Sequence, residues 1–155
     1  MRLPIVDTQR RYDMDKQDEA LKLLKDIRHI NHVIEQLQED IDRIYTSLTS
    51  TTIKPKEIDV QVSLPADPMA DKIAQAVEYQ DKLQKYQDDL IKRKNIALNI
   101  IRQMEIEEQQ LLLLRYFKGY SVEDVGSKVG YTYRWAWEKI HKAEESFITL
   151  YEKTT

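Results

Sequence analysis

Two stretches of the chain place apolar residues at the alternating spacing of three and four that one face of a long helix requires. The first stretch keeps this spacing over about four heptads, with charged residues at most other positions. After Ala20 its members are Leu23, Ile27, Ile30, Ile34, Leu37, Ile41, Ile44 and Leu48. The pattern predicts a helix of roughly 30 residues. Because such a seam would stay partly exposed in one chain, we expect it to mediate homo-oligomerisation, most simply as a homodimer, although a structural spacer explains the heptads equally well.

A second, weaker seam follows, in which tyrosine and arginine occupy some of the core-type positions. It consists of Ala76, Tyr79, Leu83, Tyr86, Leu90, Arg93, Ala97, Ile100 and Met104. Residues 49–68 separate the two seams and hold three of the four prolines, which predicts a break between two helices. The two helices can fold back on each other as an antiparallel hairpin or pair between copies, and periodicity does not decide between these arrangements.

Within this connection, the apolar residues alternate with polar ones, as they would in a strand. The alternating residues are Ile58, Val60, Val62 and Leu64. An extended segment lying along the helices explains the same alternation equally well, and no partner strand is evident. We therefore expect an all-α fold.

Residues 119–143 carry a different pattern, in which small and apolar positions fall where a helix-turn-helix needs them. Gly119 can take the left-handed conformation that ends a preceding helix, and Ser121 can cap the next one. Gly126 has no side chain to hold off a second helix that crosses closely. The apolar stripe of this short helix consists of Val122, Val125 and Val129.

The second helix of this motif begins after a glycine turn. Gly130 supplies the turn, and Thr132 can cap the helix that follows. Apolar residues spaced four, three, four and three apart give this helix an inner face. They are Ala136, Ile140, Ala143, Phe147 and Leu150. The remaining positions therefore point outward, where the major groove of DNA would meet them.

The outward positions supply the candidate DNA-binding residues. We expect the base-facing set to be Thr132, Tyr133, Arg134, Trp137, Glu138 and His141. We expect the phosphate-binding set to be Ser121, Lys128, Lys139 and Lys142. Trp135 is assigned to packing. Sequence-specific binding of double-stranded DNA is therefore the leading hypothesis.

The same residues resemble a known class of regulators. The run EDVGSKVGYT at 123–132, preceded by LRYFKG at 114–119, resembles region 4 of bacterial sigma factors. The run YTYRWAWEKIHKAEESF, after a long two-helix segment, is similar to the phage-encoded ArpU/RinA-type regulators of bacteriophages and prophages of Gram-positive bacteria. This resemblance implies a late-gene activator that acts with host RNA polymerase. Trp135 and Trp137 depart from the smaller or polar residues usual in the reading helix.

Composition is consistent with a mostly helical protein. The chain has 155 residues, of which 33% are charged, with only 3 glycines and 4 prolines. The absence of cysteine excludes disulfides and thiolate metal sites and fits a reducing cytoplasm. The sequence has neither a signal-peptide core nor a run of ~18 apolar residues, so we expect no membrane partner and a cytoplasmic location in a bacterial host cell.

The charge distribution limits the DNA-binding hypothesis. The net charge of the chain is −3, although residues 112–143 hold six basic and three acidic side chains. Acidic residues flank this segment on both sides, so we expect weak, salt-dependent DNA affinity that needs two copies or a partner. The expected organisation is a polar segment at 1–19, a coiled-coil-like antiparallel helical hairpin at 20–104, and a carboxy-terminal sigma region 4-like helix-turn-helix domain at 105–155.

Other functions find less support in the sequence. There is no glycine-rich phosphate loop and no cysteine nucleophile, so we expect no enzyme, cofactor or small-molecule substrate. His29, His32 and Glu35 have the spacing of metal ligands but fit a solvated helix face better. The cations Lys82, Lys85, Lys92, Arg93, Lys94 and Arg102 could form a second phosphate contact, although a solvated face explains them more simply. Two alternatives remain, a small terminase-like DNA-packaging subunit and a coiled-coil protein-interaction adaptor.

Overall fold

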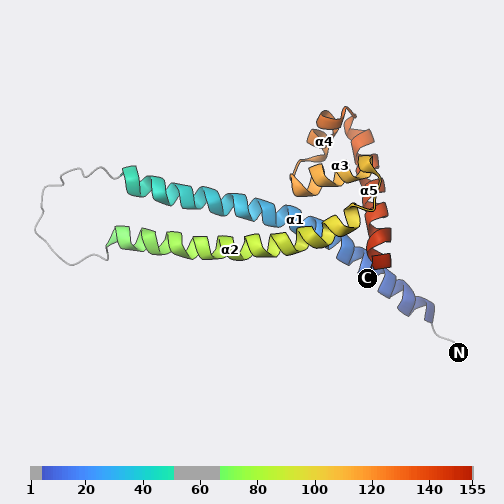
Figure 1. Ribbon diagram of the computed structural model, residues 1–155, viewed down its shortest axis with the longest axis horizontal. Coiled ribbons are helices and arrows are strands. Elements are labelled where there is room, and N and C mark those ends of the chain that lie inside the picture. The colour runs from blue at the N-terminus through green and yellow to red at the C-terminus, as the bar shows by residue number, and fades with distance from the viewer. Residues whose placement is uncertain (1–4, 51–66, 155) are drawn as a thin grey trace, which may run out of the picture. The chain divides into compact units, whose positions relative to one another are not determined.

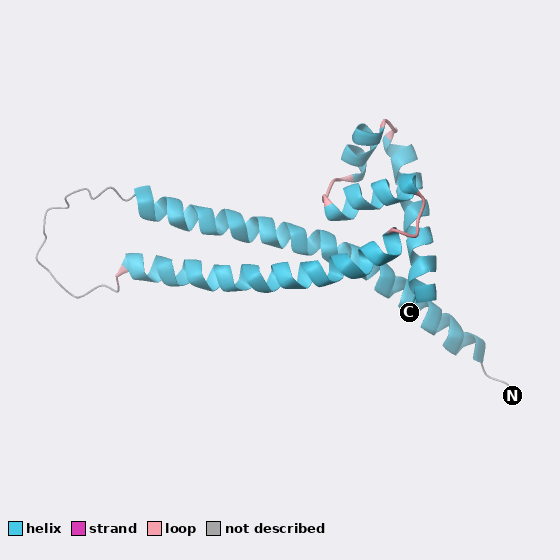
Figure 2. Ribbon diagram, viewed as in Figure 1, coloured by secondary structure: helices cyan, strands magenta, loops and turns pink. Residues whose placement is uncertain are grey.

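The computed structural model of the chain describes residues 5–50 and 67–154, with side chains from residue 15 onward (Figure 1). Every regular element in these ranges is helical and none is a strand, which confirms the all-α prediction (Figure 2). The elements are α1 (Ile5–Ser50), α2 (Pro68–Ile101), α3 (Ile106–Leu112), a π-helical turn η1 (Leu113–Phe117), α4 (Val122–Val129) and α5 (Tyr133–Thr154). The alternating residues Ile58, Val60, Val62 and Leu64 lie outside the described residues.

The first helix is longer than the heptad seam predicted. It has 46 residues rather than roughly 30, because the polar segment before Ala20 is helical from Ile5 onward. No glycine or proline lies between Ile5 and Ser50, and lysine, arginine, glutamine and glutamate are good helix formers even without an apolar stripe. Periodicity detects only the part of a helix that packs. It therefore underestimated the length of α1.

The second helix starts where proline chemistry allows it. Pro68 occupies the first helical position, where its missing N–H is not needed. The carboxylate of Asp67 accepts a hydrogen bond from the backbone N–H of Met69 at 3.0 Å. None of the described helices is long and apolar enough to cross a membrane.

The chain divides into two compact units, and the division falls within both long helices. The second unit comprises residues 32–89, in which the parts of α1 and α2 run antiparallel. The amide of Gln80 donates to the hydroxyl of Tyr45 at 3.0 Å across these helices. The buried apolar residues in the described part of this unit are Ile34, Ile41 and Ala76.

The first unit comprises residues 1–31 and 90–155 and contains the largest of the fully buried side chains among the described residues. They come from all five α-helices and are Leu24, Ile27, Ile100, Ile101, Leu111, Leu112, Val125 and Phe147. An ion pair joins Arg93 of α2 to Asp26 of α1 at 2.9 Å, with both side chains about one-third exposed or less. This unit holds every residue that the sequence analysis assigned to DNA binding.

Candidate nucleic-acid interface

Helix α4 begins at the residue that the sequence predicted. The hydroxyl of Ser121 accepts a hydrogen bond from the backbone N–H of Asp124 at 3.1 Å, in the geometry of a helix N-cap. The carboxylates of Glu123 and Asp124 lie in the first turn, where their negative charges interact favourably with the positive end of the helix dipole. Ser121 is therefore engaged in capping, so its side chain is only partly free to bind a phosphate.

The turn between α4 and α5 depends on two glycines with different roles. Gly130 has φ of 80°, in the left-handed region that the sequence analysis required of it. At Gly126, an added Cβ would lie 2.9 Å from the carbonyl oxygen of Tyr131 and 3.3 Å from the Cβ of Ala136. The two helices thus approach so closely that residue 126 has no room for a side chain.

Helix α5 packs through the face that its spacing predicted. Ala136, Ile140, Ala143 and Phe147 are buried, while Leu150 is half-buried. The hydroxyl of Thr132 accepts a hydrogen bond from the backbone N–H of Trp135 at 3.3 Å, as expected of a cap. Ile140 meets Val125 of α4 and Leu111 of α3 in one apolar cluster.

The segment before α4 contains features that the sequence pattern did not reveal. Backbone N–H groups of Lys118 and Tyr120 bond to the carbonyls of Leu113 and Leu114 at 2.9 and 3.1 Å, and these bonds close η1. Gly119 then takes φ of 76°, as expected of a residue that ends a helix. The π-helical turn itself was not predicted, because its wider winding has no separate period in the sequence.

Side chains from distant positions complete this segment. The amide of Asn31 donates to the carbonyl of Phe117 at 2.9 Å, and Arg28 donates to the carbonyl of Gly119 at 3.4 Å. Arg115 donates to the carbonyl of Tyr120 at 2.8 Å. Sequence reasoning missed Arg28 and Asn31, because their positions beside the heptad seam gave no signal of a contact to residues 117–120.

All six residues of the predicted base-facing set are exposed. They are Thr132, Tyr133, Arg134, Trp137, Glu138 and His141. Arg134 has 91% of its side chain exposed, and its Nε atom lies 3.5 Å from the carboxylate of Glu138, one turn further along the helix. At 100° per residue, Arg134 and Glu138 lie opposite the buried face of α5. These two residues are therefore the most accessible to a ligand approaching α5 from outside.

Trp137 and His141 lie to one side of this exposed ridge. Their rings are in contact, with centroids 4.0 Å apart, and the Nδ1 atom of His141 lies 3.3 Å from the carboxylate of Glu144. The hydroxyl of Tyr116 also donates to Glu144. Burial and then this hydrogen bond raise the pKa of Tyr116 well above its ordinary value, so its hydroxyl keeps its proton.

A hollow of about 390 Å³ opens beside Trp137 and His141. Its basic lining consists of Lys25 of α1 and Arg115 of η1. Its apolar lining includes Leu21, Val122, Ile140 and Ile148, and its acidic lining consists of Glu144 and Glu145. Trp137 and His141 thus border a concave surface as well as the exposed ridge of α5.

The structure separates the predicted phosphate-binding residues. Lys128 is exposed on α4, and its Nζ lies 4.7 Å from the ring centroid of Tyr120. Lys142 is exposed on α5. Lys139 is half-buried, 4.0 Å from the carboxylate of Glu107 and 5.3 Å from the ring of Trp135. The acid of α3 therefore partly neutralises Lys139, which the sequence analysis had treated as free.

Trp135 makes the packing contacts that the sequence analysis assigned to it, although half of its surface stays exposed. Its ring meets that of Tyr131 edge-on, with centroids 6.3 Å apart. The hydroxyl of Tyr131 donates to Glu107 of α3. These contacts join the turn between α4 and α5 to α3.

Within a single chain, most of the predicted oligomerisation seam is covered. Leu23, Ile27 and Ile30 are buried in the first unit, and Ile34 and Ile41 are buried in the second. The more distal members, Leu37, Ile44 and Leu48, are half-buried. The seam thus remains partly exposed only in its second half, whereas we expected the exposure of the whole seam to favour a second copy.

The remaining candidate clusters have separate environments. Arg93 pairs with Asp26, and Lys82 pairs with Glu78 at 3.5 Å, whereas Lys94 lies 5.6 Å from the ring of Phe117. His32 lies 3.7 Å from Glu35. Among the residues that the structure describes, no group of three histidine or acidic side chains could hold a metal ion.

No protein-family model, curated protein or solved structure matches this chain. What bears on function is therefore the geometry of α3 to α5 and the residues that this geometry leaves exposed.

Proposed function

We propose that the chain is a sequence-specific binder of double-stranded DNA in which α4 and α5 act as a helix-turn-helix. The close crossing at Gly126 carries this proposal. A helix pair that excludes a side chain at its crossing and turns through a left-handed glycine has the steep, compact geometry that presents a second helix to the major groove. The exposed ridge of α5 supplies polar and aromatic side chains at its first two turns.

Within this proposal, the residues of α5 divide by role. Arg134 has the reach and the paired N–H groups to donate to a guanine edge, and Glu138 can accept from a cytosine amino group. Thr132, Tyr133, Trp137 and His141 shape the preference through methyl, ring and hydroxyl contacts. Lys128 and Lys142 are the main phosphate contacts, because neither forms an ion pair with an acid among the described residues. Lys139 and the capping residue Ser121 contribute less.

The regulatory part of the proposal depends on the resemblance to sigma region 4 and to the ArpU/RinA-type regulators. It describes a late-gene activator of a phage or prophage, which works in the bacterial cytoplasm with host RNA polymerase. It includes neither catalysis nor a cofactor. We propose a homodimer, because few unengaged cations on the reading face leave one copy with weak attraction for phosphates.

Footprinting of the parent genome tests this function. Purified protein, with and without RNA polymerase, should protect a discrete duplex site. In Arg134→Ala the affinity for that site should fall about 5- to 150-fold and the preference at one base pair should relax, since one bidentate base contact contributes about 1–3 kcal/mol.

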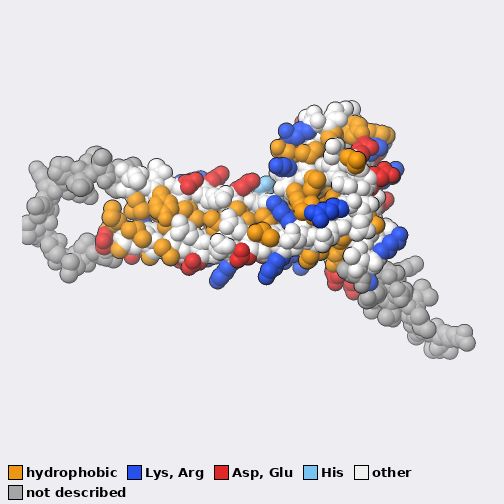
Figure 3. Space-filling model, in the orientation of Figure 1, with side chains coloured by type: hydrophobic (Ala, Val, Ile, Leu, Met, Phe, Trp, Pro, Cys, Tyr) orange, Lys and Arg blue, Asp and Glu red, His pale blue; other side chains and the backbone are white. Residues whose placement is uncertain are grey.

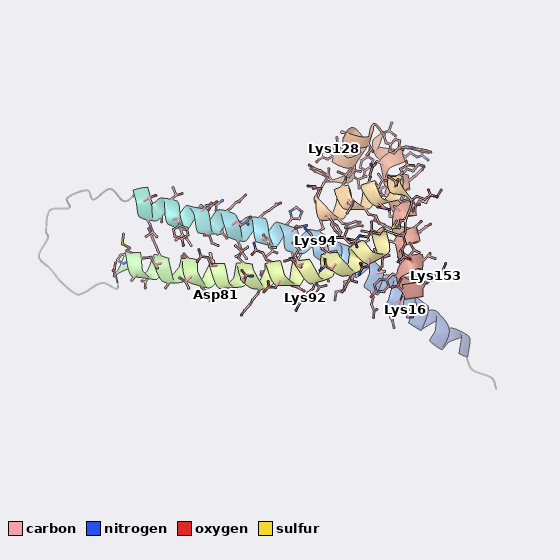
Figure 4. The ribbon with its side chains drawn as sticks, in the orientation of Figure 1. Lys16, Asp81, Lys92, Lys94, Lys128 and Lys153 are labelled. Atoms are coloured by element: carbon pink, nitrogen blue, oxygen red, sulfur yellow. The ribbon has the colours of Figure 1, made fainter. Side chains whose placement is uncertain are left out.

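Lys153→Ala is the matched control for this experiment. Lys153 is an exposed cation in the last turn of the same helix, far along α5 from Arg134 (Figure 4). Its replacement should leave site affinity within about twofold. If the wild-type protein protects no site in any part of the genome, the proposed function is wrong. Light scattering on the same sample measures copy number, and eight or more copies would favour the packaging alternative instead.

A further inference from the structure

Four cations surround the carbonyl end of η1 in the first unit, and we call them the cationic cluster: Arg28, Lys94, Arg115 and Lys118. Arg28 comes from α1 and Lys94 from α2, whereas Arg115 is the middle residue of η1 and Lys118 is the residue that follows η1. Arg28 and Arg115 donate to the carbonyls of Gly119 and Tyr120, while Lys94 lies over the ring of Phe117. The fold thus brings together positive charges that are up to 90 residues apart in sequence.

Within the part of the chain that the structure describes, the charges of the cationic cluster have no acidic partner. Among the described residues, no carboxylate lies within ion-pair distance of any of its four members, whereas neighbouring Arg93 is paired with Asp26. The Nε atom of Arg28 is buried and has no hydrogen-bond partner there. Burial and then the nearby Arg115 lower the pKa of Arg28, and burial and then Lys118 lower that of Lys94. A bound anion would relieve this mutual repulsion.

The cationic cluster is continuous with one side of the proposed reading helix. Arg115 lines the same hollow as Trp137 and His141, and Lys25 extends its positive charge along α1. Glu144 and Glu145 also line this hollow, but Glu144 already accepts from Tyr116 and lies beside His141. On the face seen in Figure 3, blue side chains of this unit gather around an apolar patch. If a DNA duplex bound to α5, the phosphate backbone of one strand would lie on the side of α5 that faces Arg115 and Lys25.

We propose that the cationic cluster binds backbone phosphates of the DNA whose bases α5 reads, on the strand that borders the major groove. This inference depends on the proposed function, and it adds a second contact surface formed by α1, α2 and η1. Phosphate contacts carry no base information, so this surface would raise affinity for all sequences alike and make binding more salt-dependent. It would also offset the scarcity of unengaged lysines on α4 and α5.

Lys94 and Lys118 are the residues to change. Arg28 and Arg115 hydrogen-bond to backbone carbonyls, so their loss would disturb the turn, whereas the side chains of the two lysines make no hydrogen bond to the described residues. The test variant is Lys94→Gln/Lys118→Gln. The matched control is Lys92→Gln/Lys22→Gln, which removes the same charge from exposed positions of α2 and α1. Lys92 and Lys94 are 200° apart on α2 and lie on different sides of it (Figure 4).

The experiment measures binding of full-length protein to two labelled duplexes, the footprinted site and a scrambled version, from about 50 to 300 mM salt. The test variant should bind both duplexes about 10- to 100-fold more weakly at low salt, with an unchanged ratio between them. Its plot of log K against log salt should be less steep by about 1 to 2, since each lost phosphate contact removes about 0.9. The control should behave as wild type.

Three outcomes separate the two proposals. If the test variant keeps the wild-type slope while Arg134→Ala still loses site preference, the cationic cluster does not bind DNA and the proposed function stands. If the wild type binds neither duplex, both proposals fail. A single-stranded RNA of equal length serves as a third probe, and if it is the only probe whose binding the variant loses, the duplex assignment is overturned. Thermal unfolding should match wild type, and Lys94→Arg/Lys118→Arg should restore the slope if charge is the cause.

Discussion

The two units of the chain reach stability in different ways. In the first unit, each of the five α-helices contributes at least one fully buried side chain, such as Leu24 of α1 or Phe147 of α5. In the second unit, the buried Ile34 and Ile41 keep 8% and 7% of their surface exposed. Met69, Ile73 and Val77 of α2 remain about half exposed there. The half of the first heptad seam that lies in the second unit therefore forms a less complete core than the half that lies in the first unit.

This difference follows from geometry. A helix pair in contact along one seam can cover only the residues between the two axes, and everything beside that seam stays wet. In the first unit, by contrast, five helical segments of different lengths pack together and can enclose a side chain from all directions. Substitutions at matched positions of the two units, or at neighbouring positions within the first, should therefore differ in cost, and the largest cost is expected where enclosure is most complete.

Phe147→Ala should destabilise the protein most. Phe147 is fully buried, and its removal loses the transfer free energy of a ring and leaves a cavity, at a cost of about 3–5 kcal/mol. Urea unfolding followed by far-UV circular dichroism would measure the change in free energy. Tyr133→Ala, at an exposed aromatic position of the same helix, should change it by less than about 0.5 kcal/mol. Equal effects at both positions would contradict the buried placement of Phe147.

Ile27→Ala and Ile41→Ala compare the same substitution in the same seam and the same helix. Ile27 is fully enclosed in the first unit, so its loss should cost near the upper end of about 2–5 kcal/mol, and Ile41 near the lower end. Hydrogen exchange would show where the effect falls. Ile41→Ala should raise exchange mainly within residues 32–89, and a uniform rise across both units would mean that they unfold as one.

Gly126→Ala and Gly130→Ala compare two kinds of glycine. The added methyl at 126 collides with the backbone of Tyr131, so we expect a cost of about 1–3 kcal/mol and weakened DNA binding. At 130 there is open space around the added methyl, and only the left-handed backbone resists, at about 1–2 kcal/mol. Gly130→Asn should recover part of the loss at 130, whereas Gly126→Asn should be worse than Gly126→Ala.

Ser121→Ala should have the smallest effect of the series. It removes the hydroxyl that caps α4, which costs about 1 kcal/mol. Ser127→Ala is the matched control, because its hydroxyl bonds only to the carbonyl of Glu123 one turn earlier in the same helix. Its removal should cost nothing measurable by the same urea unfolding experiment. A larger loss at 127 than at 121 would show that α4 is not capped where the structure places its start.

Local rules in the sequence predicted the parts of the interface that depend on local chemistry. Ser121, Gly130 and the inner face of α5 follow from capping preferences, backbone conformation and helical spacing, all of which act within a few residues. The link from Asn31 to Phe117 joins residues 86 positions apart, and no local rule contains it. Lys92 and Lys94 are equivalent in sequence, and only their faces on a packed helix distinguish them.

Local sequence rules also could not predict which charged side chains lie close together or which apolar residues are covered. Acidic residues before α4 were visible in the sequence, but only the fold shows that Glu107 lies beside Lys139 rather than in solvent. Likewise, the heptad seam predicted an apolar face correctly, yet its burial within one chain depends on how α2 and the shorter helices pack. Whether two copies of the chain associate depends on the surface that the folded chain leaves exposed. Periodicity shows only which residues share one face of a helix.

The hydrogen bonds from α1 to the carbonyls of Phe117 and Gly119 also set an order of events during synthesis. Their partners are 86 and 91 residues apart, so at ~5–20 residues per second the donors of Asn31 and Arg28 leave the ribosome roughly 4 to 18 s before their acceptors exist. The turn that positions α4 is consequently among the last parts to be completed. A chain that terminates before residue 117 would contain both long helices but neither these hydrogen bonds nor α4 and α5, so it would lack the whole of the proposed base-reading helix.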